Sequence, residues 1–237
     1  TYTVPRTHPF SPRRTATAVD AVSLTIREGE RVGLVGESGC GKSTLTRAIL
    51  GLDQLQGGTI TLGGQPMQAD TRAEVRRRLS VVFQDPYGSF NPRHKVGRLI
   101  AEPFHLLADP PRGAQRAEAV AAALSEVGLS PEDADKHIHA FSGGQRQRIA
   151  IARALIIKPA LVVFDEAVSA LDVRVRARIL DLIAGLSRSH RLAYLFISHD
   201  LTVVRSITDR VLVMQAGKIV EEGATETVFA APQHAYT

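Results

Sequence analysis

The chain has 237 residues, of which 44% are hydrophobic and 22% are charged. Both fractions are normal for a globular protein, so the chain can bury a core and is not expected to be disordered over most of its length. The net charge of +5 suits a nucleotide-binding or membrane-facing surface without demanding nucleic acid. The one cysteine, Cys40, excludes an intrachain disulfide framework and indicates a cytosolic protein, and no apolar run reaches the ~18 residues that cross a bilayer.

The first quarter of the chain predicts short strands around one helix. Residues 18–26 alternate imperfectly between apolar and polar, as in a half-exposed strand, and the apolar run 31–35 suits a buried strand. Residues 42–50 then predict a helix that ends at Gly51, a favourable C-terminal cap. Glycine pairs flank a further short strand over 59–62.

The middle of the chain predicts a helical lobe. Residues 71–79 carry four arginines, which we interpret as the solvated face of a short helix rather than a nucleic-acid patch. An apolar strand over 80–83 ends at Gln84. From residue 96 to about 140 the apolar spacing is helical and strand signals are absent, so this region indicates an inserted helical lobe.

The last third alternates helices with buried strands. We expect helices over 146–157, 171–186 and 201–206, strands over 161–164 and 195–197, a hairpin of 211–214 with 218–220, and a short helix from 225. Continuous apolar runs such as 161–164 are typical of strands buried on both faces of a parallel sheet. The alternation therefore predicts an α/β fold with a mainly parallel sheet.

Between the strand at 31–35 and the helix at 42–50 lies a segment that fits the phosphate-loop pattern G-x-x-x-x-G-K-[ST]. Its residues are Gly36, Glu37, Ser38, Gly39, Cys40, Gly41, Lys42, Ser43 and Thr44. The glycines let consecutive N–H groups point at one anion, and the helix dipole also favours phosphate. Lys42 would reach the β- and γ-phosphates, and the Ser43 hydroxyl would hold Mg²⁺. The strand and helix on either side favour this reading over a plain glycine-rich turn.

Three apolar strands end in polar groups that would meet at one edge of the sheet. They lead into the phosphate loop, into Asp165-Glu166 and into Ser198-His199. Asp165 offers the oxygen ligand that a hard cation such as Mg²⁺ needs. Glu166 can polarise the water that attacks a γ-phosphate.

These motifs, in this order, resemble the ATP-binding cassette (ABC) family, the nucleotide-binding subunits of ABC transporters, over nearly the whole chain. The matching segments are Walker A at 36–44, the Q-loop glutamine Gln84, the signature FSGGQ at 141–145, Walker B at 161–166, the D-loop SALD at 169–172 and the switch histidine His199. The resemblance implies that Glu166 and His199 are catalytic, that Gln84 contacts Mg²⁺, and that Asp172 belongs to the D-loop.

The signature residues Ser142, Gly143, Gly144 and Gln145 begin a helix, which makes a second anion site of the same type as the first. The resemblance implies that two cassettes, identical or different, bind two ATP molecules head to tail. Each signature would then complete the nucleotide site of the other subunit.

The segment QDPYGSFNPR at 84–93 and the terminal HAYT resemble the peptide and nickel importer subfamily. That resemblance implies an ATPase that energises uptake of di- or oligopeptides in bacteria, with ATP and Mg²⁺ as cofactors. It implies two membrane permease subunits and, indirectly, a substrate-binding protein as partners, no nucleic acid, and a peripheral position on the cytoplasmic face of the inner membrane. The alternatives are a nickel importer, a soluble ABC ATPase acting on DNA or ribosomes, and a regulatory module without turnover.

The fold expected from the resemblance is a P-loop NTPase core with an N-terminal antiparallel β subdomain and an inserted α-helical subdomain. We expect one ABC ATPase domain over 1–237, in which 1–84 and 159–237 form the RecA-like core and β subdomain and 85–158 forms the helical subdomain. The adenine-stacking residue is expected to be Phe10, with Tyr2 and Arg13 as further candidates.

Overall fold

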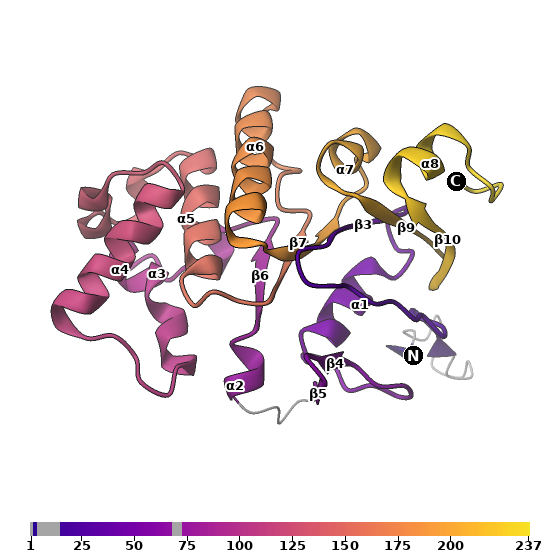
Figure 1. Cartoon of the computed structure of the whole chain (residues 1–237), viewed down its shortest axis with the longest axis horizontal. Coiled ribbons are helices and arrows are strands. Elements are labelled where there is room, and N and C mark those ends of the chain that lie inside the picture. The colour runs from indigo at the N-terminus through magenta and orange to yellow at the C-terminus, as the bar shows by residue number, and fades with distance from the viewer. Residues whose placement is uncertain (1, 4–14, 68–72) are drawn as a thin grey trace, which may run out of the picture.

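A computed structural model of the chain describes residues 2–3, 15–67 and 73–237. Its centre is a six-stranded sheet with the strand order β10-β9-β3-β8-β7-β6 (Figure 1). The strands are β3 Arg31–Val35, β6 Leu79–Phe83, β7 Leu161–Asp165, β8 Ala193–Ile197, β9 Arg210–Gln215 and β10 Lys218–Ala224. Only β10 runs antiparallel to its neighbour, so the mainly parallel sheet is confirmed.

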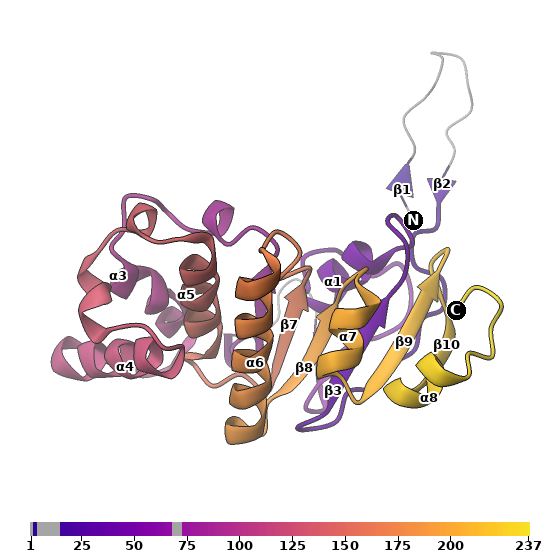
Figure 2. The ribbon, with the colours of Figure 1, turned by 90° about the horizontal axis from the view of Figure 1, so that it is seen from above.

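Helices cover both faces of this sheet (Figures 1 and 2). They are α1 Lys42–Ile49 on one face, and α6 Val173–His190, α7 Leu201–Ile207 and α8 Thr225–Ala230 on the other. The expected hairpin near the end of the chain is present as β9 and β10. No helix within the described ranges is both long and apolar enough to cross a membrane.

The alternation of side chains along each strand divides the interior into two cores. Phe164 and Phe196 belong to the core beneath α6 and α7, whereas Val163 and Leu195 belong to the core that includes α1. All four side chains are almost completely buried. The continuous apolar runs of β7 and β8 therefore follow from burial on both faces.

A helical lobe extends beyond the β6 edge of the sheet (Figure 1). Its α-helices are α3 Val96–Ile100, α4 Gly113–Glu126 and α5 Gly143–Leu155, joined by short 3₁₀ turns that include Glu102–Leu106. The core beneath α6 continues into this lobe through the buried residues Leu99, Leu124 and Ile149. The helical character predicted from residue 96 onward is thus present, partly as 3₁₀ rather than α-helix.

The strand predicted over 18–26 is wrong, because this stretch pairs with no strand in the described part of the chain. Its apolar residues Val19, Val22, Leu24 and Ile26 instead pack against the core that includes α1. The imperfect alternation therefore reflects one-sided packing of an irregular segment.

The antiparallel part of the fold is small in the described residues. It consists of β1 Tyr2–Thr3 paired with β2 Thr15–Ala16, and β4 Thr61–Leu62 paired with β5 Gln65–Pro66. The strand predicted over 59–62 is thus only two residues long. The helix predicted over 71–79 is present as the short α2, Ala73–Arg76. Residues 71–72 lie outside the described ranges, and the predicted end is wrong, because residues 77–78 form a turn and Leu79 begins β6.

Candidate functional site

The carboxyl ends of β3, β7 and β8 border a cavity of about 1020 Å³. Twelve of the residues predicted to bind or hydrolyse nucleotide line it: Gly36, Glu37, Ser38, Gly39, Gly41, Lys42, Ser43, Thr44, Gln84, Asp165, Glu166 and His199. The meeting of these strand ends, expected from the order of the motifs, is therefore observed. Ligands of open α/β sheets bind at this edge.

The lysine of the phosphate loop makes hydrogen bonds to the backbone of the same loop. Lys42 is buried, and its Nζ donates hydrogen bonds to the carbonyl oxygens of Gly36 at 2.7 Å and Glu37 at 2.9 Å. Gly41 precedes α1 with a φ of 113°, a conformation that L side chains rarely adopt. The backbone can therefore turn sharply into the helix, and the ammonium group lies within the loop, where an anion would be neutralised.

The back of the loop rests on the turn between β9 and β10. Cys40 is buried, and its carbonyl oxygen accepts a hydrogen bond of 2.8 Å from the Gly217 N–H. A Cβ on Gly36 would overlap the carbonyl oxygen of Met214 in β9. Cys40 is therefore a packing residue of the loop, and it is absent from the cavity lining.

Asp165 ends β7 at the inner wall of the cavity. Burial, followed by the nearby charge of Glu166, raises the pKa of this carboxyl group above its ordinary value, and only Lys42 opposes the shift. Ser43, Gln84 and Asp165 also border an adjoining cavity of about 550 Å³. A hydroxyl, an amide and a partly buried carboxylate supply oxygen atoms, which are the ligands that Mg²⁺ prefers.

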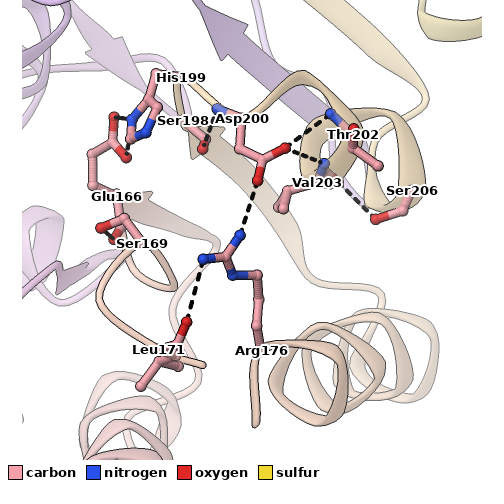
Figure 3. A network of polar contacts seen from close by, with 10 residues as sticks. All are labelled: Glu166, Ser169, Leu171, Arg176, Ser198, His199, Asp200, Thr202, Val203 and Ser206. Carbon is pink, nitrogen blue, oxygen red and sulfur yellow. Dashed lines mark hydrogen bonds and ion pairs between the residues drawn. The ribbon is translucent and has the colours of Figure 1, made fainter. Parts of the chain in front are cut away.

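Glu166 and His199, which both line the cavity, form a pair (Figure 3). The Nδ1 atom of His199 lies 3.0 Å from the carboxylate of Glu166. The Glu166 backbone has a φ of 52°, uncommon for a residue with a side chain, and its N–H donates to the Ile197 carbonyl at 3.0 Å. Backbone conformations of this kind are found often at functional sites.

Arg176 joins the loop before α6 to the loop before α7 (Figure 3). Its guanidinium group donates to the carboxylate of Asp200 at 2.9 Å and to the carbonyl oxygen of Leu171 at 3.2 Å. Asp200 also caps α7 by accepting from the N–H groups of Thr202 and Val203. Asp200, the residue that follows His199, is thus connected through Arg176 to the segment 169–172, which was predicted to be the D-loop.

The signature residues lie apart from the phosphate-loop cavity. Ser142 caps α5 by accepting from the Gln145 N–H at 3.4 Å, and Gln145 accepts in return from the Ser142 N–H at 3.0 Å. Ser142, Gly144 and Gln145 border a different cavity of about 370 Å³. One chain therefore does not bring its signature to its own phosphate loop.

Asp172, predicted in the D-loop, is the N-cap of α6 and accepts from the Val175 N–H at 3.0 Å. It does not line the phosphate-loop cavity. The helix predicted from residue 171 therefore begins after this cap, at Val173.

Arg153 of α5 fastens the loop that follows Gln84. Its guanidinium group donates to the carbonyl oxygen of Ser89 at 2.9 Å and to its hydroxyl at 2.8 Å, and lies 4.5 Å from the centre of the Phe90 ring. Burial lowers the pKa of Arg153, with the Glu102 carboxylate 3.6 Å away as a partial counter-charge. The signature helix and the loop after Gln84 are thereby joined.

Two residues at the site were missed from the sequence. Tyr236 lines the cavity and contacts Glu37, and Arg176 connects the two loops, yet no motif marks either role. The candidates for adenine stacking do not appear in the cavity lining, because Phe10 and Arg13 lie outside the described residues and the side chain of Tyr2 is not described.

The chain has relatives among known proteins. Residues 19–169 match the family model described as ABC transporter. The chain is 46% identical to the dipeptide transport ATP-binding protein DppF of Escherichia coli over 231 residues, which are 96% of this chain and 69% of that protein. It is 46% identical to the oligopeptide transport ATP-binding protein OppF of Salmonella typhimurium, again over 96% of this chain and 69% of that protein.

Another relative, the uncharacterized ABC transporter ATP-binding protein YejF of Escherichia coli, is 50% identical over 92% of this chain. The matched region makes up only 42% of the length of that protein. Among solved structures, cbiO1 from Clostridium perfringens, part of the ABC transporter complex cbiONQ, superposes with a TM-score of 0.81 at 26% identity, covering 90% of this chain and 84% of that one. A dimeric post-hydrolysis structure of the ATP-binding cassette MJ0796 with ADP and phosphate gives a TM-score of 0.77 at 27% identity, covering 89% and 91%.

Proposed function

This chain belongs to the ABC transporter family of ATPases, and from that membership we propose that it is the ATP-hydrolysing subunit of a bacterial importer of di- and oligopeptides. The observation that carries the proposal is that the phosphate loop, Asp165, Glu166 and His199 all line the same cavity. The names of the dipeptide and oligopeptide relatives support the choice of cargo.

ATP binding would use the phosphate loop and its lysine. The loop N–H groups and the N-terminus of α1 would face the phosphates. The ammonium group of Lys42 would exchange its two carbonyl partners for the β- and γ-phosphate oxygens. Because a phosphate carries full negative charge, this exchange strengthens the hydrogen bonds of Lys42.

The residues present fit a Mg²⁺ ion, which would neutralise charge on the β- and γ-phosphates. Ser43, Gln84 and Asp165 would hold it, since all three border one cavity and carry oxygen atoms. The raised pKa of Asp165 supports this assignment, because a buried carboxylate that lacks enough positive charge is stabilised by a bound cation.

Hydrolysis would proceed by attack of a water oxygen on the γ-phosphorus atom. The bond to the β–γ bridging oxygen breaks, ADP leaves, and Glu166 accepts the proton that the water loses. His199, 3.0 Å from the Glu166 carboxylate, would orient that carboxylate and contact the γ-phosphate.

A second cassette, identical or different, would complete the site. Ser142, Gly143, Gly144 and Gln145 lie away from the phosphate-loop cavity of their own chain, so we assign them to the ATP of the partner, with Asp172 in the D-loop between the subunits. ATP would hold the dimer together, because its γ-phosphate can contact both subunits while ADP contacts fewer groups.

The proposed assembly also contains two membrane permease subunits and, indirectly, a substrate-binding protein, with no nucleic acid. The cassette would act peripherally at the cytoplasmic face of the inner membrane, as one ABC ATPase domain whose helical subdomain, 85–158, is inserted into the core. Gln84 would connect the ATP site to the permeases.

The test is peptide-dependent hydrolysis in membranes that contain the chain with its permeases and binding protein. The wild type should hydrolyse ATP faster when peptide is added. Glu166→Gln should reduce hydrolysis by at least about a hundredfold, because the proton acceptor is removed, while it still binds ATP and dimerises.

Two results would contradict the proposal. Wild-type activity no higher than that of Glu166→Gln would exclude an ATPase. Recovery of the chain with ribosomes or DNA and without a permease would exclude a transporter subunit.

A further inference from the structure

A hydrogen bond connects the phosphate loop to a residue about two hundred positions later. The backbone N–H of Glu37 donates to the phenolic oxygen of Tyr236 at 2.9 Å, and the two residues are separated by 199 positions. Tyr236 is partly buried and packs against the core beneath α6 and α7, and it also lines the nucleotide cavity. The phosphate loop is therefore held from outside its own strand–loop–helix unit.

The segment that carries Tyr236 is itself anchored. The carboxylate of Glu221 in β10 accepts hydrogen bonds from the N–H groups of Gln233 at 2.8 Å and His234 at 3.1 Å. The Tyr236 N–H donates to the Nδ1 of His234 at 3.2 Å. These bonds form a compact turn, so the tyrosine approaches the loop from a position fixed to the sheet.

Glu37 is the corner of the phosphate loop. Its carbonyl oxygen accepts from Lys42 Nζ at 2.9 Å and from the Cys40 N–H at 3.3 Å, and its own N–H is the group that Tyr236 accepts from. If Lys42 turns to the phosphates when a nucleotide binds, as the proposed function requires, the Glu37 carbonyl oxygen loses its hydrogen bond from Lys42. The hydrogen bond that the Glu37 N–H donates to Tyr236 then contributes more to holding the loop in shape.

We propose that Tyr236 is a positioning residue for nucleotide binding, which holds the phosphate loop in its binding shape through the N–H of Glu37. This inference rests on the proposed function, since it concerns the same nucleotide site. The hydroxyl acts on the backbone of the loop, so it should affect every nucleotide that uses the loop, whether or not that nucleotide carries a γ-phosphate.

The experiment compares Tyr236→Phe with the wild type in calorimetric titrations with Mg²⁺ and either ADP or a non-hydrolysable ATP analogue. Loss of one hydrogen bond that orders the loop should raise both dissociation constants about three- to tenfold and by the same factor. The unfolding midpoint without nucleotide should stay within about 2 °C of the wild type, because the ring and its packing are kept.

The matched control is Tyr87→Phe. Tyr87 is 43% exposed and lies outside the large cavity, and a phenyl ring preserves its stacking under Arg146. This variant should leave both dissociation constants unchanged. A second variant, Glu221→Ala, keeps the hydroxyl but releases the turn that carries it, and should weaken both nucleotides in the same direction as Tyr236→Phe.

Three results would overturn the inference. Dissociation constants of Tyr236→Phe equal to those of Tyr87→Phe would show that the bond is irrelevant to binding. Tighter binding would show that the tyrosine obstructs the site, and a loss confined to the ATP analogue would show direct contact with the γ-phosphate. Wild-type nucleotide binding without peptide-dependent hydrolysis would instead contradict the importer proposal and leave this test intact.

Discussion

Arg176 donates a hydrogen bond of 2.9 Å to Asp200, which lies 24 positions later at the start of another helix. Because Asp200 directly follows His199, and because Arg176 also holds the carbonyl oxygen of Leu171, this one guanidinium group fixes the spacing of two loops at the site (Figure 3). The same two loops carry the pair, since Glu166 lies in the loop before α6 and His199 lies in the loop before α7.

We expect Arg176→Gln to lower the kcat of ATP hydrolysis roughly three- to tenfold with little change in KM, because His199 would be held less firmly beside Glu166. Stability should fall by about 1 kcal/mol, since the ion pair is partly exposed. Steady-state kinetics and thermal unfolding measure the two effects. Arg174→Gln, an exposed neighbour on the same helix, is the matched control. A loss of stability with an unchanged kcat would show that Arg176 is only structural.

The two signature glycines should respond differently to alanine. A Cβ on Gly144 would overlap Cγ1 of Val175 in α6, whereas the nearest atom to a Cβ on Gly143 is Cδ2 of Leu171 at 3.9 Å. Gly144→Ala should therefore reduce the free energy of unfolding by about 1–3 kcal/mol through overpacking. Gly143→Ala should be neutral or slightly stabilising, because alanine favours a helix. Equal unfolding curves for the two variants would contradict the close packing of α5 on α6.

Asp165→Asn should stabilise the nucleotide-free chain while removing a proposed Mg²⁺ ligand. Burial raises the pKa of Asp165, so the folded chain holds its proton more tightly than the unfolded chain does. The charged form is therefore unfavourable at neutral pH, and the asparagine variant should unfold about 1–3 °C higher at pH 7.5.

The sign of the pH dependence provides the check. As the pH falls through the raised pKa of Asp165 towards its ordinary value of 3.8, the wild-type carboxyl group becomes neutral and the advantage of Asp165→Asn should disappear. Melting curves from pH 7.5 down to about pH 4 measure this trend, because they extend to the ordinary pKa of the carboxyl group. Asp181→Asn, a change at an exposed position of α6, should show no such trend. An advantage that grew on acidification would contradict the assignment.

Arg153→Lys should loosen the helical lobe from the loop that follows Gln84. Lysine cannot reproduce the forked pair of hydrogen bonds to Ser89 together with the position of the guanidinium group over the Phe90 ring. We expect a loss of about 1–2 kcal/mol in unfolding free energy, and faster amide hydrogen exchange confined to residues 85–93. The exposed Arg98→Lys is the control. Unchanged exchange in 85–93 would show that Arg153 does not hold this loop.

Much of the architecture could be predicted because the relevant signals are local. Burial on both faces leaves continuous apolar runs in β7 and β8, and a phosphate loop needs glycine and lysine at fixed spacing. Residues 18–26 misled the prediction, since an alternating pattern reports which side is buried and not whether the backbone is paired.

The family, the α/β fold and the residues at the strand ends could thus be predicted from the chain alone, because residue order and spacing carry those signals. The three-dimensional arrangement was needed to show that Tyr236 contacts Glu37, that Arg176 contacts Asp200, and that the signature lies away from its own phosphate loop. Each of these depends on how elements distant in the sequence pack together. A hydrogen bond requires two atoms within about 3 Å of each other, and no periodicity along the chain encodes that distance.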